Sequence, residues 1–384
     1  MITRFQVDGF KNLVGVDLRF GPFTCIAGVN GVGKSNLFDA IRFLGALASG
    51  PLTTAAAKVR DNRRAADVGS IFHRMGDVCD RRMRFDVEMI VPQQTVDDVG
   101  QTATATMTFL RYQLELSLRT DPEIGGPQLE IRHEALLPLK QGEAARRLRF
   151  NHSLKWRKSV VLGARRGGPY VSTTTEDGQC VIRRHQDGGS RGKPSPALAS
   201  TLRGTIASVA QADAPTLLCA RREMQSWLQL QLEPTALREP STFNTAPRLQ
   251  PNGDGMAATL ARIARASKEP EAVYARIANR LADLVRDVRS IGVERNDKLE
   301  LLTLLLTDRD RTQRAARSLS DGTLRFLRSP CSKWIRKRTA CFASKNRKMA
   351  FIPTGSVRCL ASCRISHSIL KLRSDLTTRC DKWS

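Results

Sequence analysis

A glycine-rich stretch near the start of the chain limits the possible folds more than any other feature. Residues 28–35 fit the pattern G-x-x-x-x-G-K-[ST], and they read Gly28, Val29, Asn30, Gly31, Val32, Gly33, Lys34 and Ser35. The stretch follows the apolar run Phe23–Ala27, and in the next run, Ser35–Leu47, apolar residues recur with helical spacing. A strand, a glycine loop and a helix in this order are typical of a phosphate-binding loop. The sequence therefore predicts an α/β fold of the P-loop NTPase class.

Each residue type in this loop has a chemical reason. Glycines let the backbone curl so that successive N–H groups point at phosphate oxygens, and the following helix adds the positive end of its dipole. Lys34 is expected to reach the β- and γ-phosphates, and the Ser35 hydroxyl is expected to ligate Mg²⁺. The predicted cofactors are therefore ATP and Mg²⁺. The alternative, an ordinary turn with a lysine by chance, does not explain the strand and helix on either side.

Along the rest of the chain, the spacing of apolar residues changes several times between helical and strand periods. Apolar spacing predicts helices at Met256–Ser267 and Pro270–Val288. A two-residue period from about residue 83 to residue 162 predicts an inserted antiparallel sheet that forms its own layer. Residues 163–196 are rich in Gly, Arg and Ser, and they are expected to be a loop or linker. Strands are predicted at Ile2–Val7, Val14–Phe20, Phe85–Ile90, Met107–Leu118, Leu129–Leu136, Val288–Val293 and Leu299–Thr307.

A second polar stretch, Ser318–Arg325, reads as a turn that opens a helix. With the glycine loop, it resembles the ABC-type ATPase heads of the RecF/SMC group, which have an inserted sheet and a mixed central sheet. The chain is more closely similar to bacterial AAA family ATPases grouped with abortive-infection and overcoming-lysogenization nucleases. The resemblance covers most of residues 1–327 and rests on Phe10, Lys11, Asn12, the loop through Ser35 and Asn36, Asp39, Ala40, Ile41, Trp227, Pro234, Arg238, Glu239, Pro240 and Ser318–Phe326.

The resemblance implies how such a site is assembled. In these heads two subunits enclose two ATP molecules, and the Ser-x-Gly element of one subunit touches the γ-phosphate held by the other. Ser320, Asp321 and Gly322 would then act in trans, as a second helix N-terminus facing an anion. Lys11, Asn12 and Asn36 would lie near the nucleotide. For Lys11 and Asn12, a solvated turn without a role is the open alternative.

The resemblance also implies a division of the chain into four parts. Residues 1–82 would be the N-terminal part of the ATPase head, and residues 83–215 an inserted β-rich arm with a basic linker. Residues 216–327 would be the C-terminal part of the head, with the signature-like element. Residues 328–384 form a basic tail with a different composition.

The tail carries a large share of the positive charge. The chain has a formal charge of +25, and residues 328–384 contain 14 Lys and Arg against two Asp, so the tail contributes +12 and the rest +13. Clustered basic residues favour nucleic-acid binding, but no helical or strand period organises them here. A basic tail that binds nucleic acid is therefore the alternative to the explanation that follows.

The tail lacks a feature that the ATPase resemblance requires. Such heads have an apolar strand that ends in paired acids, one for Mg²⁺ and one for the attacking water. After Leu327 no apolar strand is expected, and no carboxylate occurs before Asp375. Synonymous codons for Ala343–Pro353, regrouped one base earlier, can spell Phe-Glu-Glu-Pro-Glu-Asn-Gly. We therefore expect residues 328–384 to be a frameshift product that leaves ATP hydrolysis impaired.

The predicted partners follow from the same reasoning. We expect a homodimer on ATP binding, coupled to DNA or to a nuclease or other effector in phage defence or DNA repair. No run of apolar residues approaches the length of a membrane span, so we expect a cytoplasmic protein without a membrane partner. A nucleic-acid-binding or defence module that uses ATP only as a switch is the main alternative. A GTPase is disfavoured because no N-K-x-D-like base reader is found.

Overall fold

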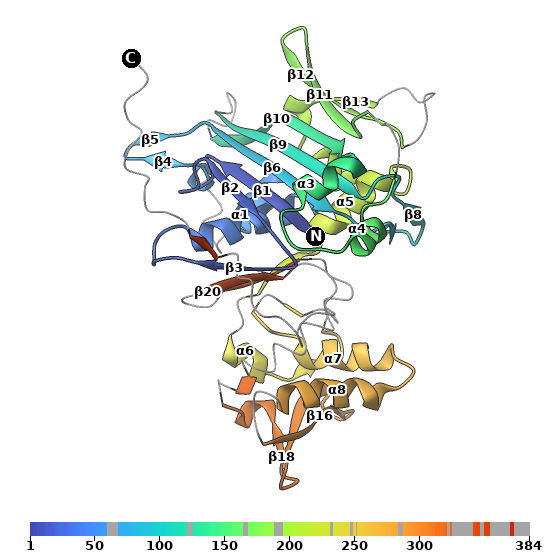
Figure 1. Ribbon diagram of the computed structural model, residues 1–384. Helices are drawn as coiled ribbons and strands as arrows, with labels where there is room; N and C mark the ends of the chain where they lie inside the picture. The colour runs from blue at the N-terminus through green and yellow to red at the C-terminus, as the bar shows by residue number, and fades with distance from the viewer. Residues whose placement is uncertain are drawn as a thin grey trace.

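An eight-stranded antiparallel sheet is the largest element of this mixed α/β fold (Figure 1). The computed structural model describes residues 1–59, 68–120, 126–163, 168–187, 195–230, 233–245, 249–250, 252–282, 287–320, 323–324, 341–345, 349–353 and 369–371. The strand order is β13-β12-β11-β10-β9-β6-β1-β2. The strands are β1 (Ile2–Asp8), β2 (Val16–Arg19), β6 (Arg82–Ile90), β9 (Phe109–Thr120), β10 (Pro127–Pro138), β11 (Val171–Glu176), β12 (Gln179–Arg184) and β13 (Ser195–Leu198).

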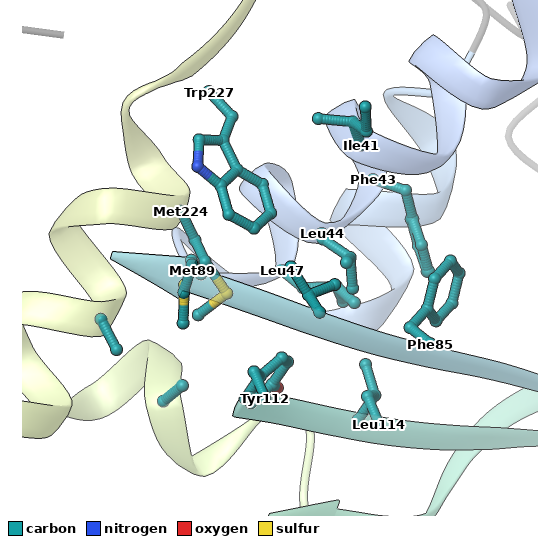
Figure 2. Close-up of a cluster of buried hydrophobic side chains, with 14 of the residues drawn as sticks. Ile41, Phe43, Leu44, Leu47, Phe85, Met89, Tyr112, Leu114, Met224 and Trp227 are labelled. Atoms are coloured by element: carbon teal, nitrogen blue, oxygen red, sulfur yellow. The ribbon is translucent and has the colours of Figure 1, made fainter. Parts of the chain in front are cut away.

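One face of this sheet forms the main hydrophobic core. Alternate residues of the strands point to it, as a two-residue period requires, and helices α1 (Lys34–Leu47) and α5 (Pro215–Gln225) cover it. Helical spacing places the apolar residues of α1 on the side that faces the strands. Figure 2 shows the resulting cluster, which includes Ile41, Phe43, Leu44, Leu47, Phe85, Met89, Tyr112, Leu114, Met224 and Trp227.

The opposite face of the sheet is polar and partly covered by the segment between β10 and β11. Val87 lies in the main core, so Glu88, the next residue along β6, points to the other face. Arg147 of α3 (Ala144–Arg147) binds Glu88 there. Leu148 and Val161 pack with Phe109 in a small separate cluster, which anchors α3 and α4 (Leu154–Val160). Figure 1 shows α3 and α4 in front of the sheet.

A second core lies in the part of the chain that follows β14 (Trp227–Leu230) (Figure 1). It contains α7 (Met256–Arg265), α8 (Pro270–Ala282), β15 (Ser241–Thr242), β16 (Val288–Asn296), β17 (Leu301–Asp308) and β18 (Gln313–Ala315). The two predicted helices are present, but α8 does not include Val288, which is the first residue of β16. Val288 fits either pattern in sequence, because a β-branched residue suits a strand and its spacing also suits the helix.

Another sheet, of five strands, contains both the strand before the glycine loop and three strands of the tail. Its order is β14-β19-β20-β3-β21, and it mixes parallel and antiparallel pairs. The strands are β14 (Trp227–Leu230), β19 (Cys341–Lys345), β20 (Met349–Pro353), β3 (Phe23–Ala27) and β21 (Ile369–Lys371). The prediction that no strand follows Leu327 is therefore wrong for the backbone, because strand pairing with β3 and β14 tolerates a weak sequence pattern.

Two other expectations also need correction. The inserted strands do not form their own layer, because β6 pairs with β1 in one continuous sheet. Residues 171–184 are not a loop, since β11 and β12 form a hairpin that extends this sheet. The Gly- and Arg-rich residues 164–167 and 188–194, which motivated the loop prediction, lie outside the described residues. Composition over a window of that size hid two short strands between them.

The remaining elements are short. They are α2 (Leu52–Ala57), α6 (Pro234–Arg238), β4 (Arg74–Met75), β5 (Val78–Cys79), β7 (Gln94–Val96), β8 (Thr102–Thr104) and the 3₁₀ turns Val68–Ile71, Gln141–Glu143, Ala199–Thr201, Ile206–Val209 and Ala316–Ser318. Within the described ranges, every helix is too short or too polar to cross a bilayer.

Candidate nucleotide-binding site

The glycine loop connects the end of β3 to the start of α1, as the sequence pattern predicts. Gly31 has φ 89° and Gly33 has φ 102°, which is the left-handed region that favours glycine. A Cβ at Gly33 would also lie 2.8 Å from Oδ1 of Asn12, so the Asn12 side chain would have to move. Glycine is therefore favoured at position 33 by the backbone turn, and its missing side chain lets Asn12 approach.

The loop is exposed and the end of α1 is open to an anion. Residues 28–31 are exposed, and Val29 has 72% of its surface accessible. No side chain caps the start of α1, and the first turn contains no acidic residue. The first N–H groups of a helix have no partner within the helix and carry the positive end of its dipole. This end of α1 can therefore accept a phosphate.

Lys34 lies over the loop that it follows. Its Nζ donates to the carbonyl oxygen of Gly28 at 2.7 Å and to that of Val29 at 2.6 Å. An ammonium group has three hydrogen-bond donors and no acceptor. It forms stronger hydrogen bonds to charged phosphate oxygens than to neutral carbonyl oxygens, so a phosphate can replace Gly28 and Val29 as its partner. Lys34 therefore lies at the loop, and its binding of the β- and γ-phosphates stays a prediction.

Lys11 is fixed beside the loop by contacts on three sides. Its Nζ lies 2.9 Å from Oδ2 of Asp39, a buried carboxylate of α1. Its backbone N–H donates to Ile71, and its carbonyl oxygen lies 2.6 Å from Nδ1 of His73. Lys11 also has a positive φ of 50°. Lys11 is therefore part of a packed junction rather than a solvated turn, and its amine is committed to α1.

Asn12 joins the turn after β1 to the loop. Nδ2 of Asn36 donates to Oδ1 of Asn12 at 2.6 Å, and the Asn12 side chain packs against Gly33. The structure therefore brings Lys11, Asn12 and Asn36 together at the start of α1. Sequence reasoning reached Asp39 only through the resemblance and missed His73. No local signal marks their pairing with Lys11, because 28 and 62 residues separate them from it.

Ser35 is half-buried in the first turn of α1, where its hydroxyl can ligate Mg²⁺. Within the described ranges, no three His, Cys, Asp or Glu side chains gather as a metal site. The site geometry therefore fits the phosphate end of ATP, and Ser35 would hold Mg²⁺ together with the phosphates. Ser35 alone would be a weak ligand for the metal.

The signature-like element belongs to the second core. Leu319 is buried there, and Nη2 of Arg238 donates to its carbonyl oxygen at 3.0 Å. Ser320 is exposed, and its Oγ accepts the N–H of Thr323 at 3.2 Å, which is the geometry of a helix cap. Asp321 and Gly322 lie outside the described residues. The predicted helix start is thus observed at Ser320, on a different core from the glycine loop.

Comparison with known proteins gives a limited match. No family model matches the chain. The DNA replication and repair protein RecF of Clavibacter sepedonicus is 29% identical over 113 residues. The chain is similar to RecF. The match with RecF covers 29% of this chain and 27% of RecF, so the chain spans only about a quarter of that relative's length.

Solved structures with likeness to the chain are RecF and SMC heads. An SMC head bound to the C-terminal winged-helix domain of ScpA is 15% identical, with a TM-score of 0.41, over 88% of this chain and 76% of that one. A structure of RecF with ATP is 17% identical, with a TM-score of 0.20, over 34% of this chain and 26% of that one. The SMC head domain of Thermotoga maritima is 10% identical, with a TM-score of 0.28, over 92% of this chain and 99% of that one.

Proposed function

We propose that this chain is an ATP-binding head of the RecF/SMC type that holds ATP and Mg²⁺ at residues 28–35. The observation that carries the proposal is the exposed glycine loop on an uncapped helix, with Lys34 lying over it. Backbone N–H groups and Lys34 would bind the phosphates, and Ser35 would ligate Mg²⁺. Lys11, Asn12 and Asn36 would hold the loop in shape, because they pack against α1 and Gly33.

ATP hydrolysis requires a group that orients the attacking water and further ligands for Mg²⁺. In ATPases of this class these are acids at the end of a strand beside the loop. The strands β19, β20 and β21, which share a sheet with β3, contain no Asp or Glu. We therefore propose that the chain binds ATP well and hydrolyses it slowly.

Dimerisation on ATP would use the second core. Ser320 caps the N–H of Thr323, and by the resemblance Ser320, Asp321 and Gly322 would reach the γ-phosphate bound by another copy. Closure of two heads around ATP would then be passed to DNA or to an effector protein. The absence of acids from β19 to β21 also favours a second candidate function, in which ATP acts only as a switch for this closure.

ATP binding by the wild-type chain and by Lys34→Ala tests the proposal, with Lys268→Ala as the control at an exposed lysine. Loss of the charge-assisted hydrogen bonds of Lys34 is expected to weaken Mg-ATP binding roughly 10- to 100-fold. Lys268→Ala is expected to bind as wild type does. Light scattering with and without ATP shows whether a dimer forms. Equal ATP affinity of wild type and Lys34→Ala would contradict the proposal, and fast turnover by wild type would contradict impaired hydrolysis.

A further inference from the structure

The segment between β10 and β11 concentrates positive charge on the polar face of the main sheet. Residues 144–163 contain no Asp or Glu, and their basic residues are Arg146, Arg147, Arg149, Lys155, Arg157 and Lys158. This is six of the thirteen net charges that residues 1–327 carry. Arg146, Arg149, Lys155 and Lys158 are exposed. None of these basic residues belongs to the glycine loop.

A buried carboxylate organises the arginines at one end of the segment. Glu88 is fully buried, and it accepts Nη1 of Arg147 at 2.7 Å and Nη1 of Arg19 at 3.2 Å. Nη1 of Arg4 lies 3.7 Å from the same carboxylate. Arg4 also pairs with Asp17 at 2.6 Å, and Arg147 pairs with Glu143 at 2.9 Å, so three guanidinium groups share three carboxylates. Their positions are set by contacts inside the sheet and do not depend on a ligand.

Beside this cluster, a hollow of about 290 Å³ is lined by arginine alone: Arg19, Arg146, Arg147 and Arg149. Neither Arg146 nor Arg149 forms a hydrogen bond or ion pair with a residue that the structure describes. Burial lowers the pKa of Arg19, Glu88 and Asp17 raise it, and the nearby charges of Arg4 and Arg149 lower it. Arg146 and Arg149 add positive charge that the carboxylates of this cluster do not balance, and an anion bound in the hollow would relieve it.

Aromatic side chains make the rest of the segment rigid. The rings of Phe150 and Trp156 are 5.5 Å apart at 70°, and His152 lies 5.5 Å from Trp156. Oγ of Ser153 accepts the N–H of Trp156 and caps α4. Lys155 and Lys158 are exposed on this short helix. These contacts hold α4, which carries Lys155 and Lys158, against Phe150, the residue that follows Arg149 of the hollow.

We propose that residues 144–163, together with Arg19, form a surface that binds the phosphodiester backbone of DNA. Guanidinium groups match phosphate oxygens in two-point contacts, and successive phosphates need a row of basic groups. An acidic peptide is disfavoured because the hollow offers no apolar side chain to anchor one. The inference rests on the proposed DNA-linked function and assigns the surface that serves it.

Phe150 of this surface lies beside Gly21, in the turn before β3, and β3 leads into the glycine loop. A Cβ placed on Gly21 would lie 3.3 Å from Cβ of Phe150, and Gly21 precedes β3 by two residues. β3 then runs directly to Gly28. A displacement of the basic segment by DNA would therefore reach the nucleotide site through one strand.

The test measures binding of the full chain to short fluorescein-labelled DNA, duplex or single-stranded, by anisotropy over a range of salt. Arg146→Ala/Arg149→Ala is expected to bind about tenfold more weakly. For duplex DNA, the slope of log K against log salt should fall by about 2, at about 0.9 for each lost phosphate contact. The matched control, Arg262→Ala/Arg265→Ala, removes the same charge from exposed positions on α7 and should bind as wild type does.

Several outcomes would overturn the proposal. They are unchanged DNA binding by Arg146→Ala/Arg149→Ala, an equal loss in the α7 control, or displacement of DNA by poly-L-glutamate as effectively as by unlabelled DNA. The last outcome would indicate an acidic protein partner. ATP binding of each variant is measured without DNA, so that the two proposals fail separately. Lost DNA binding with intact ATP binding supports the surface, and failure of wild type to bind ATP contradicts only the nucleotide site.

Discussion

Glu134 shows how a single buried carboxylate holds two distant parts of this chain together. It is fully buried on β10, and it accepts the N–H groups of Ile206 and Ala207 at 2.7 Å and 3.1 Å. The hydroxyl of Tyr112 donates to it at 3.0 Å. Burial raises the pKa of Glu134, against the opposite effect of these three donors. Glu134 thus links the sheet to the turn before α5.

Glu134→Ala is expected to lower the free energy of unfolding by about 3 kcal/mol or more, since it leaves three buried donors unsatisfied at about 1–3 kcal/mol each. Tyr112→Phe, which removes one of those donors, should cost only about 1 kcal/mol. Denaturant unfolding monitored by circular dichroism measures both. A loss for Glu134→Ala no larger than that for Tyr112→Phe would show that water satisfies the two N–H groups.

The cost of Glu134→Ala should also depend on pH. A carboxyl whose folded pKa is raised contributes stability that is fully present below its unfolded pKa and is lost as pH rises through the folded pKa. The ordinary pKa of a glutamate carboxyl is 4.5, and burial raises the pKa of Glu134 above it. The difference between wild type and Glu134→Ala should therefore shrink as the pH rises above 4.5 and through the raised pKa of Glu134. A difference that grows over this range would contradict the raised pKa.

At the scale of elements, α1 depends on a close approach that only glycine permits. A Cβ on Gly45 would lie 3.0 Å from the carbonyl oxygen of Met224 and 3.6 Å from that of Trp227. These residues end α5 and begin β14, and Figure 2 shows both side chains beside α1. Glycine inside a helix costs about 1 kcal/mol relative to alanine, so packing must offset that cost.

Gly45→Val is expected to destabilise the chain by about 1–3 kcal/mol, because the added methyl groups overlap backbone atoms that cannot move independently. Gly50→Val is the matched control, since no atom lies within 4 Å of its Cβ position. Unfolding in guanidinium chloride compares the two. If both variants lose the same stability, the contact of Gly45 with Met224 is not the cause of the loss.

Elements whose sequence signals lie within a few neighbouring residues were predicted well. Strand β3, the glycine loop and α1 were all predicted within one residue, because their signals lie within neighbouring residues. The contact of Gly45 with Met224 could not be predicted, since it joins residues that are far apart in the chain. The same holds for Glu88 and Arg147, whose pairing depends on the placement of α3 over the sheet. The short strands β11 and β12 were not predicted from the sequence, because basic, Gly-rich stretches flank them on both sides.

At the scale of the whole molecule, strands of the tail share a sheet with β3, the strand that leads into the glycine loop. β19 is antiparallel to β20, and β20 is antiparallel to β3, so β19 runs in the same direction as β3. Lys345 pairs with Ala350, and Ala350 pairs with Ile26. The carboxyl end of β19 therefore lies at the same edge of the sheet as Gly28. Acids that follow such a strand would be placed beside the phosphates.

This backbone arrangement supports the frameshift hypothesis. The codons of Ser344, Lys345 and Asn346, regrouped one base earlier, can spell the paired glutamates that the tail lacks, at the carboxyl end of β19. Two steps of the regrouped reading do not depend on codon choice. Met349 before Ala350 gives a glycine codon, and Trp334 before Ile335 gives an aspartate codon.

Restoring the reading frame after Leu327 is expected to raise ATP turnover at least roughly 100-fold, because a group that orients the attacking water is regained. ATP affinity should change little, since the glycine loop is the same in both proteins. Phosphate release at saturating ATP measures turnover, and a restored protein with both glutamates replaced by glutamine is the control. The nucleotide sequence around codon 327 decides the premise directly. If its codons cannot spell the paired glutamates, or if the chain already hydrolyses ATP at the restored rate, the tail is native and the acids must come from elsewhere.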